Sequence, residues 1–244
     1  MTKKLSSFFE QINIDPSSYY IELDTGSSIL EMDPKRFEIE PRQFLEYAYS
    51  DFELEGNHGL INALSNVKRA IESQSEVIHF SLGIPYENLS FPGKMENIQK
   101  MGFSPSVILK HINKIRVDLE HFYKIPDYER VEDAVQIAQL FLDVTTLFLS
   151  NFWVSFNIFS DKEENKTKDY RTFNGFHVDF SKGTFEIEFW KEGVSIISIS
   201  ITPAELEDYF LMINLLIDLE KHSHNMNEDI QKRIFQRFYA KAIE

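Results

Sequence analysis

The chain has 244 residues, of which 25 are Lys or Arg and 39 are Asp or Glu, so its formal net charge is −14. Such an acidic chain is not a general nucleic-acid coat, because binding to phosphates depends on Lys and Arg. It contains no cysteine, which excludes a disulfide scaffold, a thiol nucleophile and a cysteine-bound zinc or iron–sulfur site. Length and composition therefore indicate a folded protein with one large domain or two small ones.

The sequence shows no targeting or membrane-spanning segment. The opening run MTKKLSSFFEQINI includes two lysines but no long apolar stretch, so it does not read as a signal peptide. No window approaches the roughly 18 uninterrupted apolar residues of a transmembrane helix. We therefore expect a cytoplasmic protein without a membrane partner.

Residues 1–40 contain short runs that are typical of strands. YYIELD and SILEMD flank Thr25-Gly26, a plausible turn, and RFEIE follows a proline. The prediction for this segment is a set of short N-terminal strands, with the C-terminal sheet as the place where they could join.

From Pro41 the apolar residues recur at helical spacing. Ser104-Pro105 is a favourable helix start, and Pro126 prevents continuation of that helix. The prolines and glycines between residues 84 and 103 indicate a long loop. Helices are predicted over about 41–52, 57–82, 104–124 and 127–150. Residues 41–150 are thus expected to form an antiparallel four-helix bundle.

The pattern changes to strand-like alternation after residue 150. FWVSFNIFS, TFEIEFW and GVSIISISI predict an antiparallel meander. Thr202-Pro203-Ala204-Glu205 resembles a capping box and predicts a helix that begins there and reaches about residue 220. A last helix is expected over 228–242. The predicted fold class is therefore α+β, with residues 151–244 forming a β-meander plus two helices.

Familiar catalytic motifs are absent: there is no P-loop, no dinucleotide-binding glycine motif, no HExxH and no GxSxG. His222 and His224 lie in KHSHNMNED between two predicted helices. No third ligand is implied, so a polar loop is favoured over a metal site. We expect neither a metal nor another cofactor.

The segment 113–142 carries the candidate chemistry. It contains Arg116 and, five positions later, His121. Arginine presents a permanent forked charge to phosphate oxygens, and imidazole titrates near neutral pH. The alternative is that Arg116 forms an ion pair with Glu120 at i,i+4, and that His121 is a half-exposed polar residue or a contact between copies.

Residues 41–149 resemble the HEPN superfamily (higher eukaryotes and prokaryotes nucleotide-binding). The resemblance rests on QFLEYAYSDFELEGNHGLINALSNVKRAIESQ, which is similar to the first HEPN helix pair, and on IRVDLEHFYKIPDYERVEDAVQIAQLFL, which contains the Arg-x(4–6)-His motif. It implies a HEPN-like four-helix bundle. The implied activity is that of a metal-independent endoribonuclease, of the kind that serves as a toxin or defence effector.

In such an enzyme the 2′-OH of RNA attacks the adjacent phosphate. His121 would transfer a proton and Arg116 would stabilise the developing charge. One histidine per chain does not easily serve both proton transfers, so the resemblance implies a homodimer, joined through the helical bundle, with a composite site. Lys110, Lys114 and Lys124 make this segment locally basic and are expected to bind RNA. A protein regulator or antitoxin is a further expected partner.

The sequence departs from the family pattern at one position. HEPN ribonucleases usually have a polar residue after the motif arginine, whereas this chain has Val117. Together with the net charge, this favours an alternative function: a catalytically inactive HEPN-type dimerisation or protein-interaction module. Glu72, Asp51 and Tyr123 are candidates for accessory groups in either case.

Overall fold

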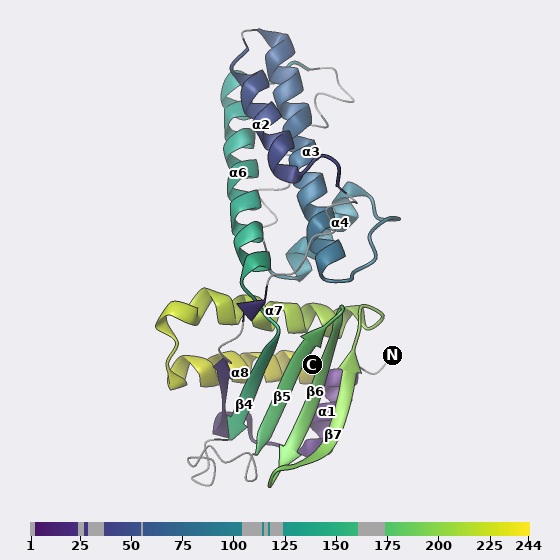
Figure 1. The fold of residues 1–244 in the computed structure, drawn as a ribbon, viewed down its shortest axis with the longest axis vertical. Coiled ribbons are helices and arrows are strands. Elements are labelled where there is room, and N and C mark those ends of the chain that lie inside the picture. Colours follow the sequence, from purple (N-terminus) through teal and green to yellow (C-terminus); the bar gives the residue numbers. More distant parts are fainter. Residues whose placement is uncertain are drawn as a thin grey trace. The chain divides into compact units, whose positions relative to one another are not determined.

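The computed structural model describes residues 3–23, 27–28, 37–54, 56–103, 114, 117, 124–160 and 174–244. The chain forms two compact units (Figure 1). The sheet unit comprises Met1–Ile29 and Ser150–Glu244, and the helical unit comprises Leu30–Leu149. The presence of helices together with an antiparallel sheet confirms the predicted α+β class. No helix in the described part of the chain combines the length and apolar character needed to cross a membrane.

The sheet unit is built on a five-stranded antiparallel sheet with the order β1-β4-β5-β6-β7. Four of its strands follow one another along the chain, whereas β1 comes from the N-terminal segment and pairs with β4 at one edge. Tyr19 lies opposite Ser160 in that pairing, and Leu23 lies opposite Phe156. The strands are β1 (Tyr19–Leu23), β4 (Ser155–Ser160), β5 (Gly175–Ser181), β6 (Thr184–Lys191) and β7 (Val194–Ile201).

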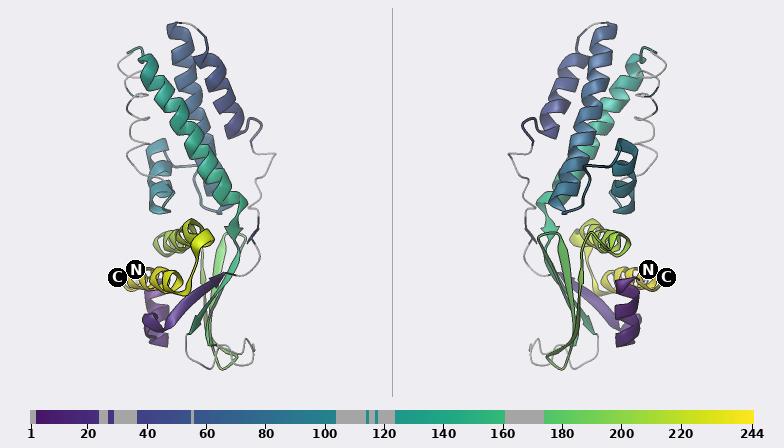
Figure 2. Two further views of the ribbon diagram at one scale, coloured as in Figure 1. Left: turned by 90° about the vertical axis from the view of Figure 1, so that its left-hand side faces the viewer. Right: turned by 90° about the vertical axis from the view of Figure 1, so that its right-hand side faces the viewer.

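Three helices cover one face of this sheet (Figure 2). The strands alternate between side chains buried beneath these helices and side chains on the opposite face. Phe176 lies at the centre of the buried layer, and its ring centroid is 6.0 Å from that of Phe8 and 5.9 Å from that of Phe235. The helices are α1 (Lys4–Ile12), α7 (Leu206–His222) and α8 (Glu228–Ile243).

The N-terminal segment differs from its prediction in two places. Helix α1 was not expected, because its apolar residues form only a short run. The strand predicted at RFEIE is wrong for residues 37–40, which form a bend that leads into the next helix. Only Ser27–Ser28 of SILEMD is described as a strand, β2, and it pairs with β3 (Phe152–Trp153). The turn expected at Thr25-Gly26 lies outside the described residues.

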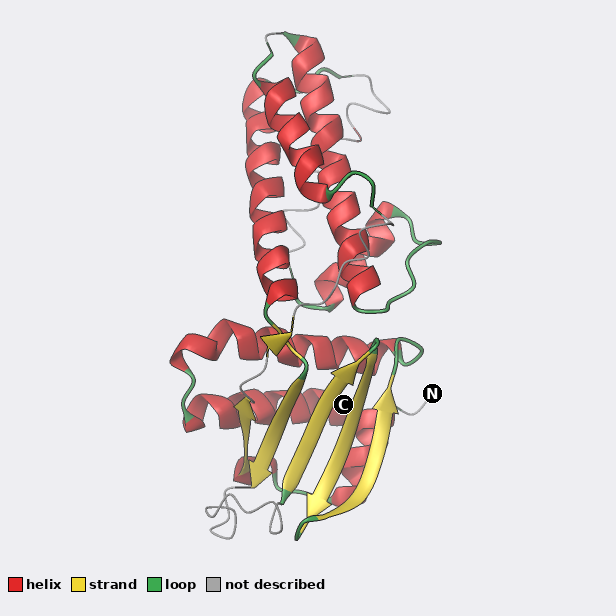
Figure 3. Ribbon diagram, viewed as in Figure 1, coloured by secondary structure: helices red, strands yellow, loops and turns green. Residues whose placement is uncertain are grey.

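The helical unit consists of helices packed side by side (Figure 3), and α3 and α6 are the longest of those described. Gln74 on α3 donates a hydrogen bond of 2.8 Å to Thr145 on α6. Arg42 on α2 forms an ion pair with Asp143 on α6. Apolar side chains such as Leu64 fill the space between the helices. The described helices of this unit are α2 (Pro41–Phe52), α3 (Asn57–Ser81), α4 (Phe91–Lys100) and α6 (Tyr128–Ser150).

The loop predicted at 84–103 is wrong, since it contains α4. Ser90 caps this helix by accepting a hydrogen bond of 3.4 Å from the backbone of Gly93. Pro92 lies in the first turn, where a missing N–H costs nothing. The helix predicted at 104–124 lies outside the described residues except for Lys114 and Val117, and both of these are helical.

The predicted start of α7 is also corrected. Thr202 and Glu205 make the expected contact, in which the Thr202 backbone N–H donates to the Glu205 carboxylate at 3.0 Å. This contact closes a turn, and the helix itself begins only at Leu206. Lys4 forms an ion pair of 2.7 Å with Glu205. The bonds from Lys4 and then from Thr202 lower the pKa of Glu205 to about 2.

Candidate functional sites

Five residues are predicted to act in catalysis or RNA binding from the HEPN resemblance. Three of them, Arg116, His121 and Lys110, lie outside the described residues. The side chains of Lys114 and Lys124 are exposed, as direct contact with a phosphate requires. The composite site therefore stays a prediction.

Of the accessory candidates, Asp51 and Glu72 are described, and both have partners within the helical unit. Asp51 accepts a hydrogen bond of 2.8 Å from the side chain of Asn66. Glu72 forms an ion pair of 3.2 Å with Lys94. These contacts favour a packing role over an accessory catalytic role for both carboxylates. Tyr123 lies outside the described residues.

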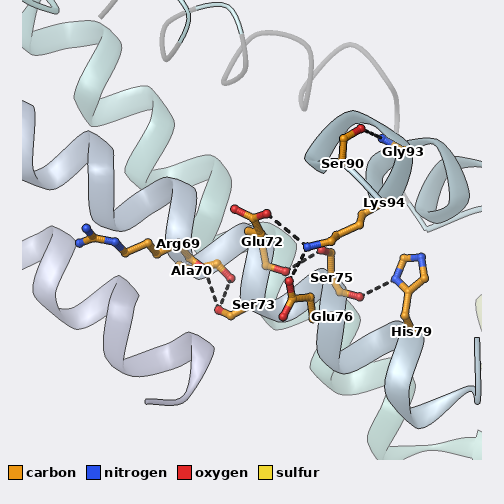
Figure 4. Close-up of polar contacts among 10 residues, drawn as sticks. All are labelled: Arg69, Ala70, Glu72, Ser73, Ser75, Glu76, His79, Ser90, Gly93 and Lys94. Carbon is orange, nitrogen blue, oxygen red and sulfur yellow. Dashed lines mark hydrogen bonds and ion pairs between the residues drawn. The ribbon is translucent and has the colours of Figure 1, made fainter. Parts of the chain in front are cut away.

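A buried ionic cluster joins α4 to α3 (Figure 4). The Lys94 side chain is only 8% exposed and contacts the carboxylates of Glu72 and Glu76. Burial tends to lower the pKa of Lys94, but hydrogen bonds and charge from Glu76 and then Glu72 outweigh it and raise the pKa. Lys94 is therefore a charged, fully partnered lysine rather than a neutral nucleophile.

His79 lies beside this cluster and is 0% exposed. Its Nδ1 lies 2.7 Å from the carbonyl oxygen of Ser75, which can only accept, so Nδ1 carries the hydrogen. Its Nε2 lies 3.3 Å from the amide nitrogen of Asn97 on α4. Burial lowers the pKa of His79 and nearby Lys94 lowers it further, against the opposing effect of the bond to Ser75. His79 is therefore a neutral histidine with a hydrogen-bond partner at each ring nitrogen, and its contact with Asn97 joins α3 to α4.

The second polar arrangement lies on the outer face of the sheet, which we define as the face opposite α1, α7 and α8. The strand register aligns one row of side chains across all five strands. His177 lies within it and shares a hydrogen bond of 2.9 Å with the side-chain oxygen of Asn157. The residues of this row are Glu22, Asn157, His177, Glu188 and Ser198.

Two further rows flank this central row. On one side, Tyr20 lies opposite Phe159 with its ring stacked at 5.9 Å, and Trp190 lies two strands beyond. On the other side, Asp179 lies directly opposite Glu186. The outer face thus places a row of aromatic rings and a pair of adjacent carboxylates on either side of a polar row.

The described residues contain no group of three or more His, Asp or Glu side chains arranged to hold a metal ion. His222 and His224 belong to no such group. The carboxylates of the outer face are therefore spread too widely to serve as one metal centre.

The sequence predicts neither cluster. The Lys94 cluster depends on α4, and the prolines and glycines of residues 84–103 indicate a loop there. The outer face had a readable signal, since its members occupy alternate positions of the predicted strands. Only the pairing register brings them into rows, and the pairing of β1 with β4 joins segments that are far apart in the sequence.

Comparison with known proteins does not assign the chain to a family. No protein-family description, no curated protein and no solved structure matches it. The resemblance of residues 41–149 to the HEPN superfamily rests on the quoted segments alone.

Proposed function

We propose that this protein is a dimerising interaction module, in which the helical unit joins two copies and the sheet unit binds a partner protein. The observation that supports the proposal is an apolar stripe on α6. Leu140, Val144 and Leu147 are 57%, 49% and 60% exposed, respectively. Their spacing places them on one side of the helix, and the half-buried Ile137 extends the same stripe. Stripes of this kind are the contact surfaces of paired helices.

The stripe is self-complementary. In an antiparallel pair of α6 helices centred on residue 142, Ile137 faces the second copy's Leu147, and Leu140 faces the second copy's Val144. The charged residue next to the centre of the stripe, Asp143, already forms an ion pair with Arg42. Two chains of net charge −14 repel each other, so the apolar centre of the stripe is where they can meet. We therefore assign the stripe to a second copy of this chain.

The size of the stripe sets the expected strength of the dimer. Stable interfaces bury about 1,600 Å² in total, and smaller ones belong to weak or transient complexes. Four side chains from each copy form a small interface. We expect a reversible dimer whose population rises with protein concentration.

Sedimentation equilibrium of the wild type and a Val144→Glu variant tests the dimer. The substitution places a charge in the stripe of each copy, so the dissociation constant should rise at least about tenfold. Gln99→Glu, an exposed change on α4 of the same unit, should shift it about twofold or less. A wild type that stays monomeric at every concentration would reject the dimer.

Cross-linking tests the register, because the chain has no cysteine of its own. A mixture of Leu140→Cys and Val144→Cys variants should form more disulfide-linked dimer than either variant alone. Equal yields in the three samples would contradict the antiparallel register.

The second candidate function is a HEPN-like metal-independent endoribonuclease that cleaves RNA by 2′-OH transesterification. It is favoured by the exposed side chains of Lys114 and Lys124, which bracket the Arg116 and His121 motif in the sequence. The composite site would use the same dimer, so the two functions share the α6 stripe.

RNA cleavage in EDTA separates the two candidates. The ribonuclease predicts cleavage by the wild type that ends in a cyclic phosphate and is lost in His121→Ala and Arg116→Ala. It also predicts that expression of the wild type slows growth and that His121→Ala relieves this effect. Absence of cleavage by a folded dimer, with no effect on growth, would favour the interaction module.

A further inference from the structure

We propose that the outer face of the sheet binds a cationic segment of another polypeptide. Among the outer positions of the described strands, carboxylates recur and neither Lys nor Arg occurs. A surface with charge of one sign attracts partners of the other sign and repels like-charged ones. The carboxylates of this face are Glu22, Asp179, Glu186 and Glu188.

Two of these carboxylates occupy positions that cost the sheet stability. Asp179 and Glu186 are direct cross-strand neighbours, and like charges in that relationship are destabilising. Glu188 projects from the same face two residues along β6. The Ser200 hydroxyl donates a hydrogen bond of 2.6 Å to Glu186 but brings no positive charge. A bound cation would offset this repulsion.

The row of aromatic rings on the outer face indicates a second property of the partner. Trp190, Tyr20 and Phe159 lie on the same face, beside the central row. Guanidinium groups stack on aromatic rings and form forked hydrogen bonds with carboxylates. A segment that contains arginine can therefore use both features of the face at once.

Other cations and polymers fit this face less well. A single metal ion is disfavoured because no three acidic or histidine ligands converge among the described residues. RNA is disfavoured because its phosphates would face carboxylates. The carboxylates lie on β1, β5 and β6, and adjacent strands are about 4.8 Å apart. An extended polypeptide can span such a distance while placing successive side chains on the face.

This inference rests on the proposed interaction function and specifies the partner's chemistry. The probe is a fluorescent peptide of alternating Arg and Ser residues, measured by anisotropy at low ionic strength. The test variant is Glu186→Gln/Glu188→Gln on the outer face. The matched control is Glu10→Gln/Glu207→Gln, which removes the same charge from exposed positions on α1 and α7.

We expect the outer-face variant to weaken peptide binding about tenfold and the control about twofold or less. Equal losses in the two variants would overturn the proposal, because only the net charge would then matter. Absence of wild-type binding would also overturn it. Circular dichroism of each variant checks that the sheet unit is folded.

Tryptophan fluorescence locates the bound peptide independently. Trp153 and Trp190 are the two tryptophans of the chain, so Trp153→Phe leaves Trp190 as the reporter on the outer face. Peptide binding should change its emission, and an unchanged emission at saturation would place the peptide elsewhere. Sedimentation of the same samples separates the two proposals, since a dimer that binds no peptide would reject only this one.

Discussion

The carboxylate of Asp208 on α7 accepts a hydrogen bond of 2.7 Å from the backbone N–H of Lys4, although the two residues lie 204 positions apart. The same oxygen accepts a longer bond of 3.3 Å from the N–H of Leu5. Lys3 precedes α1 and provides no side-chain cap. Asp208, which is only 3% exposed, thus caps a helix to which it is not adjacent in sequence.

Replacing this cap should loosen the N-terminal helix. We expect Asp208→Ala to lower the free energy of unfolding of the sheet unit by about 1–2 kcal/mol, because the first N–H groups of α1 lose their acceptor. Both tryptophans lie in this unit, so their fluorescence during urea denaturation reports its unfolding. Glu207→Ala, an exposed neighbour, should change it by less than about 0.5 kcal/mol. Equal effects of the two changes would rule out the capping role.

Burial of His79 predicts a pH dependence of the helical unit. Its pKa in the folded protein lies below the ordinary value of 6.5, chiefly because burial disfavours the charged form. As the pH falls below about 6.5, the unfolded chain takes up a proton at this residue before the folded chain does, so stability falls. The decrease continues until the pH reaches the lower folded-state pKa.

Hydrogen exchange of α3 and α4 as a function of pH measures this effect. His79→Gln should flatten the acid-side loss of protection, whereas His58→Gln, at the exposed start of the same helix, should leave it in place. A wild-type profile that does not change between neutral and mildly acidic pH would contradict a buried neutral His79.

Lys94 should contribute more to stability than either of its acidic partners. Lys94→Met leaves Glu72 and Glu76 facing each other without a cation. Breaking a buried ion pair is costly, but these carboxylates are partly solvated, so we expect the free energy of unfolding to fall by about 2 kcal/mol. Glu72→Gln should cost less, because Glu76 still pairs with Lys94. Hydrogen exchange of the α4 backbone amides measures this loss. Greater protection in Lys94→Met than in Glu72→Gln would contradict the role of Lys94 in holding α4 against α3.

Two glycines should respond to alanine in opposite directions. At Gly175 on β5, a Cβ atom would overlap the carbonyl oxygen of Ile158 on the neighbouring strand, so Gly175→Ala should destabilise the sheet unit by about 2 kcal/mol or more. At Gly93 in α4, a Cβ atom would meet its nearest neighbour at 3.6 Å, and Gly93→Ala should stabilise α4 by about 0.5 kcal/mol. Thermal unfolding, followed by tryptophan fluorescence for the first and helical circular dichroism for the second, checks both signs.

The local chemistry of the sequence was sufficient to predict most of the long elements. Helical spacing of apolar residues indicated α3 and α6, and alternation indicated β6 and β7. These patterns are readable because each element buries one face against its own unit. Short elements lack enough repeats for such a signal, and for this reason the sequence predicts neither α1 nor α4.

Partnerships between distant segments were decided by the tertiary structure alone. Nothing near Lys4 in the sequence indicates Asp208 as its cap, and nothing near Glu22 indicates Asn157 as its cross-strand neighbour. Amino-acid types and spacing determined the long helices and strands, and that the chain is strongly acidic. The register of the sheet decided that its outer face gathers these charges, because a shift of one residue in strand pairing would move every side chain to the other face.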